Sequence, residues 1–408
     1  MLKYLVRFFP QLIILMTLSP VVNAFSFGKI PQMYDYIVYI VIAVTAFWYY
    51  IAHYKTIWKD NKWLALFYDV LIAYVIIGYL KNHFVPSGLF SFFKMRICAA
   101  FLAFGCTFMF MYEPNLIKRV VHLWWKIVPL TFLLTFWKVE ISQYIILMHF
   151  CLLFLIFLPY FSKKRKMIII SALLFIVYSG LQQRIDFLNI AFPVLLYIIL
   201  RIGKKWSKSF YKAFFHVLML VPIFFLLCFL KTGFNVLDMN SYIHDDIKSK
   251  TAGNMTDDTR SLLYEEAYVS AVDNHYLWLG RTPYYGYDSP WVEQRDGDAL
   301  IYKGVAQRVS EVFIVNMLTW AGLFGCVLFF LMYYKIGIDT LARTRNNVLS
   351  ILCLYISVFW VICWISHYMF VPSLDYMILY MVIALCLNHN NRELDNQQME
   401  TTLKKILN

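Results

Sequence analysis

Long apolar runs, separated by short polar and basic clusters, dominate the chain. The runs are about 17 to 24 residues long, a length that lets an α-helix cross about 30 Å of hydrocarbon. Inside lipid every backbone N–H and C=O must be paired within the segment, so the runs are predicted to be helices. A transmembrane barrel would instead show segments of about ten residues with alternating polarity, which the sequence lacks. The predicted fold class is all-α: a polytopic integral membrane protein.

The apolar runs predict about twelve transmembrane helices and one large loop. The predicted spans are residues 6–26, 34–53, 63–82, 94–112, 120–138, 142–161, 167–182, 186–202, 212–231, 309–334, 347–367 and 370–388. The predicted organisation is nine spans in residues 1–231, an extracytoplasmic loop subdomain in 232–307, three spans in 308–388 and a cytoplasmic tail in 389–408.

Basic residues divide unevenly between the two sides of these spans. If the N-terminus is cytoplasmic, that side holds about 22 Lys and Arg residues, against about six in the short hairpins on the other side. Cytoplasmic loops carry such an excess. The sequence therefore predicts a multi-pass protein of the bacterial inner (cytoplasmic) membrane, with both termini cytoplasmic and the large loop outside.

The first predicted span has two interpretations. Lys3 and Arg7, an apolar stretch and then residues 22–24 (VNA) are similar to a signal peptide with a small-residue cleavage site. Multispanning proteins usually keep their first helix, so we expect a retained anchor, with cleavage as the open alternative. Either outcome leaves the rest of the predicted topology unchanged.

Composition narrows the class of protein. Hydrophobic residues make up 61% of the chain and charged residues 15%, whereas a soluble domain carries about 25% charged residues. The net charge of +13 raises the question of a nucleic-acid partner, but none is expected, because the basic residues mark one side of a membrane. All eight cysteines lie in apolar runs, so neither a disulfide framework nor a CxxC metal site is expected.

The loop of residues 232–307 differs from the rest of the chain, because it holds about half of the acidic residues. A loop this long without secondary structure is uncommon, so a small folded subdomain or lid is expected. Residues 257–267 are predicted to form a short helix with an Asp cap. Turn residues between Gly280 and Pro290 then alternate with aromatics. Aromatic faces beside carboxylates suit a carbohydrate site, but a self-packed aromatic core explains the pattern equally well.

Two arginines are candidates for binding an anion. Arg184, next to Gln183, lies in a short turn on the same side as the large loop. A fixed guanidinium there could bind a phosphate bidentately, or Arg184 could simply neutralise Asp186. Arg260 follows Asp258 at the start of the predicted loop helix, where a helix N-terminus favours an anion. A capping Asp beside a solvated Arg is the alternative there.

Candidates for proton transfer lie in the loop and at its exit. Glu311 follows Arg308 and Ser310 at the mouth of the tenth predicted span. A carboxylate at a membrane boundary should have its ionised form disfavoured, which suits a general base or acid. A helix N-terminal Glu favoured by the macrodipole is the alternative. His244 and His275 of the loop could also serve as base, although a lone His is more often a surface residue.

The layout and three motifs together resemble the bacterial O-antigen polymerase and ligase family. Arg184 stands where the family has an arginine at an extracytoplasmic helix end ahead of the loop. Residues 258–261 (DTRS) are similar to the family's D-[ST]-R-x pattern, and the segment from Ser310 to residues 322–325 (GLFG) is similar to its apolar segment ending in G-[LI]-x-G. Ligases typically carry a histidine where this chain has Ser310 and Glu311, so the resemblance favours a Wzy-type repeat-unit polymerase.

The resemblance implies a polyprenyl-diphosphate-linked oligosaccharide as substrate, polymerised outside the cytoplasmic membrane. The leaving group is a diphosphate, so cations are needed where its charge develops, and a base, Glu311 or His275, must take the proton of the attacking hydroxyl. No nucleotide, metal or other cofactor is implied, and the partners are the lipid bilayer and a candidate chain-length regulator. The candidate substrate-binding residues are Arg184, Arg260, Arg308, Asp258 and Gln183.

Three other functions were weighed from the sequence. An O-antigen ligase would transfer the glycan to lipid A core. A transporter or flippase for lipid-linked sugars is typically built from repeats with charges at mid-membrane, a pattern absent here. A membrane O-acyltransferase would need an essential His or Ser near a tunnel. The histidines available for it lie singly in apolar runs, where packed neutral histidines are the commoner explanation: His122, His149, His216 and His367.

Overall fold

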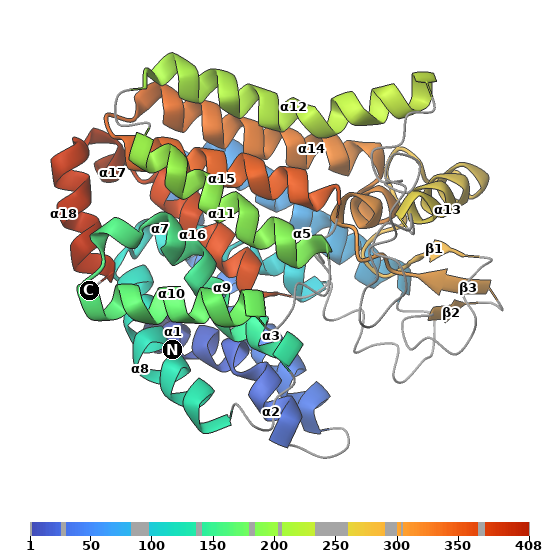
Figure 1. Ribbon diagram of the computed structural model, residues 1–408. Coiled ribbons are helices and arrows are strands. Elements are labelled where there is room, and N and C mark those ends of the chain that lie inside the picture. The colour runs from blue at the N-terminus through green and yellow to red at the C-terminus, as the bar shows by residue number, and fades with distance from the viewer. Residues whose placement is uncertain are drawn as a thin grey trace.

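The computed structural model describes residues 2–25, 30–82, 98–135, 141–178, 184–202, 206–232, 260–289, 300–302, 305–365 and 372–407. These ranges are almost entirely helical, which confirms the predicted all-α class (Figure 1). The first half contains α1 (Leu2–Thr17), α2 (Ser19–Phe25), α3 (Ile30–Ala52), α4 (Tyr54–Asp60), α5 (Lys62–Asn82), α7 (Cys106–Tyr112), α8 (Asn115–Thr135), α9 (Ile141–Ile156), a 3₁₀ turn (Leu158–Tyr160), α10 (Lys163–Tyr178) and α11 (Arg184–Ile202). The second half contains α12 (Lys208–Thr232), α13 (Arg260–Asp273), β1 (Tyr287–Asp288), β2 (Leu300–Tyr302), β3 (Val305–Arg308), α14 (Phe313–Arg343), α15 (Asn347–Cys363), α16 (Leu374–Leu387), α17 (His389–Glu393) and α18 (Asn396–Leu407).

Several of these helices can cross a membrane. Within the described ranges, four helices are long and apolar enough: α3, α5, α12 and α14. The number rises to six if two bent pairs, α1 with α2 and Cys98–Tyr112 with α8, are each counted as one span. The described part of the chain is therefore a helical bundle with four to six candidate membrane spans.

Proline explains where the first predicted span bends. α1 and α2 meet at 52° around Leu18. Pro20, at the second position of α2, has no N–H and disfavours helical geometry in the residue before it. The Ser19 hydroxyl donates a hydrogen bond to the Asp35 carboxylate of α3, and both residues are buried. The first residue of α2 is therefore held against α3 by a buried polar contact.

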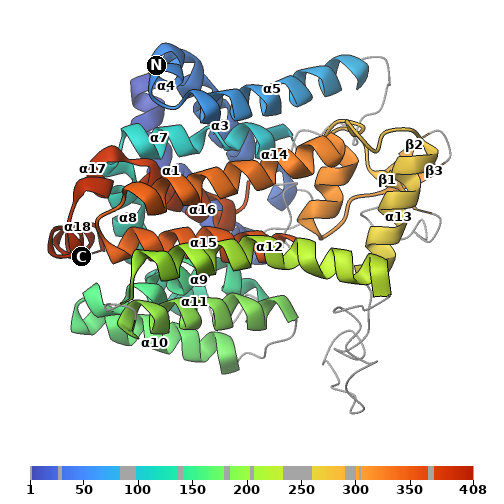
Figure 2. The ribbon, with the colours of Figure 1, turned by 90° about the horizontal axis from the view of Figure 1, so that it is seen from above.

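The helices lie side by side, with different structures at the two ends of the bundle. α1 begins and α18 ends at the end that also carries α17, whereas α13 and the three strands lie at the opposite end (Figures 1 and 2). α13 runs across the direction of the bundle helices (Figure 2). Both ends of the described chain thus lie on one side, and α13 with the small sheet lies on the other.

The end with α17 and α18 joins the basic segments of the sequence. Arg119 Nη2 donates to the Arg7 carbonyl at 2.7 Å, and Lys208 Nζ donates to the Thr344 carbonyl at 2.6 Å. Arg392 is buried there, and its guanidinium donates to the Cys386 carbonyl in the last turn of α16 and to the Thr340 hydroxyl of α14. Tertiary contacts therefore bring together basic segments that are far apart in the sequence.

Interlocking aromatic rings fill the middle of the bundle. Phe67 of α5 makes edge contacts with Phe104 and with Phe329 of α14, at 5.0 Å between centroids in each case. Phe104 also contacts Tyr380 of α16 at 5.5 Å. Edge-to-face pairs of this kind add to the free energy gained from burial. They place α5, α14 and α16 around one core.

The large loop forms a helix and a small sheet. The predicted helix at 257–267 is found as α13, Arg260–Asp273. The antiparallel sheet has the strand order β1–β3–β2 and pairs Tyr287 with Arg308 and Tyr302 with Val305. Only turns were expected between Gly280 and Pro290, where β1 lies, and no strand was predicted at β2 or β3, because strands of two to four residues are too short to show alternating polarity.

Candidate functional site

The predicted anion-binding residues are placed by their backbone positions. Arg184 is the first residue of α11, Arg260 the first of α13, and Arg308 the last of β3. α11 begins at the end of the bundle where α13 and the sheet lie (Figure 1). Gln183 and Asp258 lie outside the described residues. Three of the five predicted substrate-binding positions are therefore at the same end of the molecule.

Glu311 is half-buried between β3 and α14, and the backbone on both sides of it is held. The Ser310 N–H donates to Asn316 Oδ1 at 2.8 Å, and Asn316 Nδ2 donates to the Ser310 carbonyl at 2.6 Å. The Val312 N–H donates to Ser310 Oγ at 3.0 Å. Ser310 and Asn316 are both buried. A carboxylate used in chemistry must be held in place by such neighbours, and Glu311 meets that condition.

His275 has a structural role at the end of α13. Its φ of +57° is left-handed, and its N–H donates to the Val272 carbonyl, while the Tyr276 N–H donates to the Ala271 carbonyl. This pair of bonds ends a helix in a Schellman motif, at a position where glycine is the commonest residue. The side chain is exposed. The third candidate, His244, lies outside the described residues, so Glu311 is the predicted proton-transfer residue that is held in a defined environment.

An ion pair at the centre of the subdomain was not among the predicted sites. Arg281 donates from Nη1 to Asp288 Oδ1 at 2.8 Å and from Nη2 to Asp288 Oδ2 at 2.7 Å, the bidentate geometry that suits a planar guanidinium. Its Cζ lies 4.3 Å from the centroid of the Tyr276 ring. Asn274 Nδ2 also donates to Asp288, at 2.8 Å. The pair ties the turn after α13 to β1, and Asp288 neutralises the charge of Arg281.

The inner face of α13 carries further polar groups. Ser270 Oγ accepts hydrogen bonds from the Tyr276 hydroxyl and the Asp288 N–H, and burial raises the pKa of the Tyr276 phenol. Glu266, one turn earlier, is 5% exposed. Its Oε1 accepts from Ser289 Oγ at 2.8 Å, but Oε2 has no hydrogen-bond partner in the part of the chain that the structure describes. Buried polar atoms without partners are uncommon, so Glu266 is a second candidate for proton transfer.

The turn of residues 276–282 is inserted into a break in α14. Gly322, with φ +65°, interrupts the helix, and the short first part of α14 turns across the long second part (Figure 2). Two carbonyls before the break accept from the turn, and two N–H groups after it donate to the turn. These groups would otherwise lack helical partners. The four bonds are Arg281 N to Thr319 O (2.7 Å), Thr282 N to Trp320 O (2.9 Å), Leu323 N to Leu277 O (2.8 Å) and Phe324 N to Trp278 O (3.1 Å).

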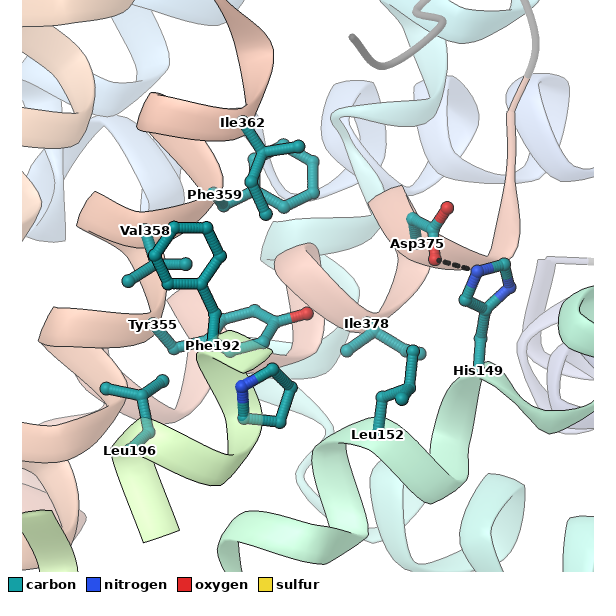
Figure 3. A pocket seen from close by; sticks show the side chains of 11 residues that line it. His149, Leu152, Phe192, Leu196, Tyr355, Val358, Phe359, Ile362, Asp375 and Ile378 are labelled. Carbon is teal, nitrogen blue, oxygen red and sulfur yellow. Dashed lines mark ion pairs between the residues drawn. The ribbon is translucent and has the colours of Figure 1, made fainter. Parts of the chain in front are cut away.

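A pocket between α9, α11, α15 and α16 contains a second pair of ionisable side chains (Figure 3). His149 Nε2 lies 3.3 Å from Asp375 Oδ1. The Tyr355 hydroxyl points into the pocket, and apolar side chains, among them Phe192 and Ile378, form most of its wall. From the sequence, His149 was expected to be a packed neutral histidine without an ionisable partner, because Asp375 lies more than 200 residues further along the chain.

The end of the bundle that carries α13 therefore combines three arginine positions with Glu311 and the buried Glu266. Fixed cations can stabilise a developing anionic group, and a positioned carboxyl can transfer a proton. No family model matches the chain, and neither a curated protein nor a solved structure is significantly similar to it.

Proposed function

We propose that the protein polymerises polyprenyl-diphosphate-linked oligosaccharide repeat units of a surface polysaccharide, an O-antigen or a capsule, at the extracytoplasmic face of the inner membrane. The proposal rests on the positions of three arginines and Glu311 in the fold. Arg184, Arg260 and Arg308 begin or end elements at one end of an apolar bundle, and Glu311 lies directly after the last of them. A lipid-linked anionic substrate requires cations at the surface of a membrane-spanning bundle.

The proposal includes twelve spans with both termini in the cytoplasm. Two observations support this topology. The first is that α1 begins and α18 ends at the same end of the bundle (Figure 1). The second is that hydrogen bonds from Arg119 to Arg7 and from Lys208 to Thr344 bring basic segments together at that end. Basic residues mark the cytoplasmic side. α13 and the sheet then face the compartment outside the inner membrane, where a flipped lipid-linked substrate is found.

The proposed reaction is a glycosyl transfer. A sugar hydroxyl attacks the anomeric carbon of the lipid-linked donor, the new glycosidic C–O bond forms, and the bond to the diphosphate breaks. The electron pair leaves with the polyprenyl diphosphate, whose charge Arg184 and Arg260 stabilise. The hydroxyl proton passes to a carboxylate, for which Glu311 is the first candidate and Glu266 the second.

The test is a gel of surface polysaccharide from a strain that lacks the gene and is complemented with variants. We expect Arg184→Ala, Arg260→Ala and Glu311→Ala to reduce the ladder to a single repeat unit at normal protein levels. Arg201→Ala is the matched control, because Arg201 is exposed at the opposite end of α11. That variant should keep the full ladder.

Other outcomes point elsewhere. Full-length polymer stranded on the lipid carrier in the deletion strain would indicate a ligase. An unchanged ladder in the deletion strain would refute the polymerase and the ligase alike. A normal ladder with both Arg184→Ala and Arg260→Ala would leave the protein a polymerase but place the diphosphate at other residues.

A further inference from the structure

The turn of residues 276–282 exposes two large apolar side chains at its tip. Trp278 is 71% exposed and Leu279 is 65% exposed. The exposed residues of α13, which precedes the turn, include the apolar Tyr268, Val269 and Val272 beside the charged Glu265 and Asp273. Contiguous exposed apolar surface on a protein marks a site of interaction.

The lipid-facing stripe of α14 leads directly to this turn. Leu323, Val327 and Leu331 are exposed along one side of the helix, four residues apart, so they share one face. The stripe ends at Lys335, whose ammonium lies 5.4 Å from the centroid of the Trp63 ring, a Trp–Lys pair typical of a membrane interface. From Lys335 to Leu323 the helix rises about 18 Å. This is less than the roughly 30 Å of the hydrocarbon core, so the break in α14 lies at membrane depth.

α5 gives a similar depth, measured from the same Lys335–Trp63 level. An added Cβ at Gly78 would lie within 3 Å of Tyr284 and Thr282 side-chain atoms, so the end of the turn packs against Gly78. Gly78 lies about 22 Å along α5 from Trp63. Leu80, further out on the same helix, is still 61% exposed. Both distances are shorter than the hydrocarbon core, so the turn lies within its outer half.

The backbone of the turn is suited to that depth. Non-helical backbone is tolerated within a membrane only where its polar groups are paired with protein. The four bonds to α14 described above pair this turn, and the Gly280 N–H donates to the Tyr276 carbonyl at 2.8 Å. The Ala321 carbonyl, at the break itself, accepts from the Tyr74 hydroxyl of α5 at 3.3 Å.

We propose that the turn of residues 276–282 re-enters the outer leaflet of the membrane, and that Trp278 and Leu279 bind phospholipid there. Trp is suited to the level of the headgroups because its ring is amphipathic, and Leu279 faces the upper acyl chains. The turn anchors the extracytoplasmic subdomain to the bilayer at the point where it closes the break in α14. This inference rests on the membrane topology proposed above and not on the proposed reaction.

The test is photocrosslinking in vesicles of dioleoylphosphatidylcholine. The full-length chain is made with benzoylphenylalanine at position 278 or at position 279, reconstituted and irradiated, and its peptides are searched by mass spectrometry for phospholipid adducts. Val327, exposed on the lipid-facing stripe of α14, is the position for the positive control. Thr401, exposed on the polar helix α18, is the position for the negative control. We expect an adduct yield at 278 and 279 comparable to that at 327, and no adduct at 401.

Three results would overturn the inference. If 278 and 279 behave like 401 while 327 gives lipid adducts, the turn lies in water. If 278 and 279 crosslink to protein instead of lipid, the surface is a protein contact. A lack of lipid adducts at position 327 would refute the proposed membrane topology on which the inference rests. None of these results depends on polymer synthesis, which the gel assay measures separately.

Discussion

Gly280 packs against the backbone of Trp320 and Ala321 beside the break in α14, and Gly322 packs against the backbone of Trp278 and Leu279. An added Cβ at Gly280 would lie 2.4 Å from the Ala321 nitrogen, and one at Gly322 would lie 2.3 Å from the Trp278 carbonyl. Both residues have φ near +70°, at +72° and +65°. Any side chain at either position would therefore meet backbone atoms that cannot move aside, in a conformation that residues with a Cβ adopt only at a cost. The contact between the turn and the broken helix depends on these two glycines.

Gly322→Ala should destabilise the protein strongly. The added methyl group clashes with the Trp278 carbonyl, and a left-handed alanine is strained, so together we expect about 3 kcal/mol or more. The measurement is the thermal unfolding midpoint of purified protein in detergent. Leu323→Ala is the control, because Leu323 is the next residue and its side chain is exposed. Equal midpoints for the two variants would contradict the interlocked backbone.

Asn316→Ala should loosen the backbone around Glu311. The change leaves the Ser310 N–H and carbonyl without their partner in a buried site, which costs about 2 kcal/mol. Thr319→Ala is the matched control, since Thr319 is buried on the same helix and its hydroxyl bonds only to the Val315 carbonyl. We expect Asn316→Ala to lower both the unfolding midpoint and the amount of polymer more than the control does. If both variants make the same ladder, the fixed position of Glu311 has no part in the reaction.

A double-mutant cycle at Arg281 and Asp288 should show strong coupling. Each single alanine variant leaves the partly buried charge of the other residue without its partner, whereas the double variant removes both charges. The expected coupling energy is about 1–3 kcal/mol, measured from unfolding in denaturant of the two single variants, the double variant and the parent. Additive effects would mean that the pair does not hold the turn against β1.

His149 and Asp375 should depend on one another in the same manner. Replacing either one alone by Leu leaves its polar partner in an apolar pocket, at a cost of about 3 kcal/mol. The double variant His149→Leu with Asp375→Leu should regain most of the lost stability, because an apolar pair can fill such a site without charge. Thermal midpoints of the three variants provide the comparison. A double variant less stable than both single variants would show that the pocket requires the polar pair.

Local pattern was enough to identify the long apolar segments as helical, because every hydrogen bond of an α-helix closes within four residues, whereas α17 and α18 lie in residues predicted only as a tail. The loop helix illustrates this: residues 257–267 were predicted, and α13 covers Arg260–Asp273. The three-stranded sheet was not predicted, because its strands are too short to show alternating polarity and because β1 is brought beside β3 only by the fold. The roles of Arg184, Arg260, Arg308 and Glu311 in binding and catalysis stay predictions.

The sequence by itself thus determined an apolar helical protein, and it predicted an excess of basic residues on one side and singled out the positions of three arginines and Glu311. Only the tertiary structure decided that Gly322 breaks α14 and that residues 276–282 fill the break. It likewise paired His149 with Asp375 and buried Glu266. The physical reason is the range of the interactions. The length and charge of an apolar run are set by residues that are neighbours in the sequence. Close backbone contacts and buried polar pairs join distant segments, and whether those segments meet depends on the packing of the whole bundle.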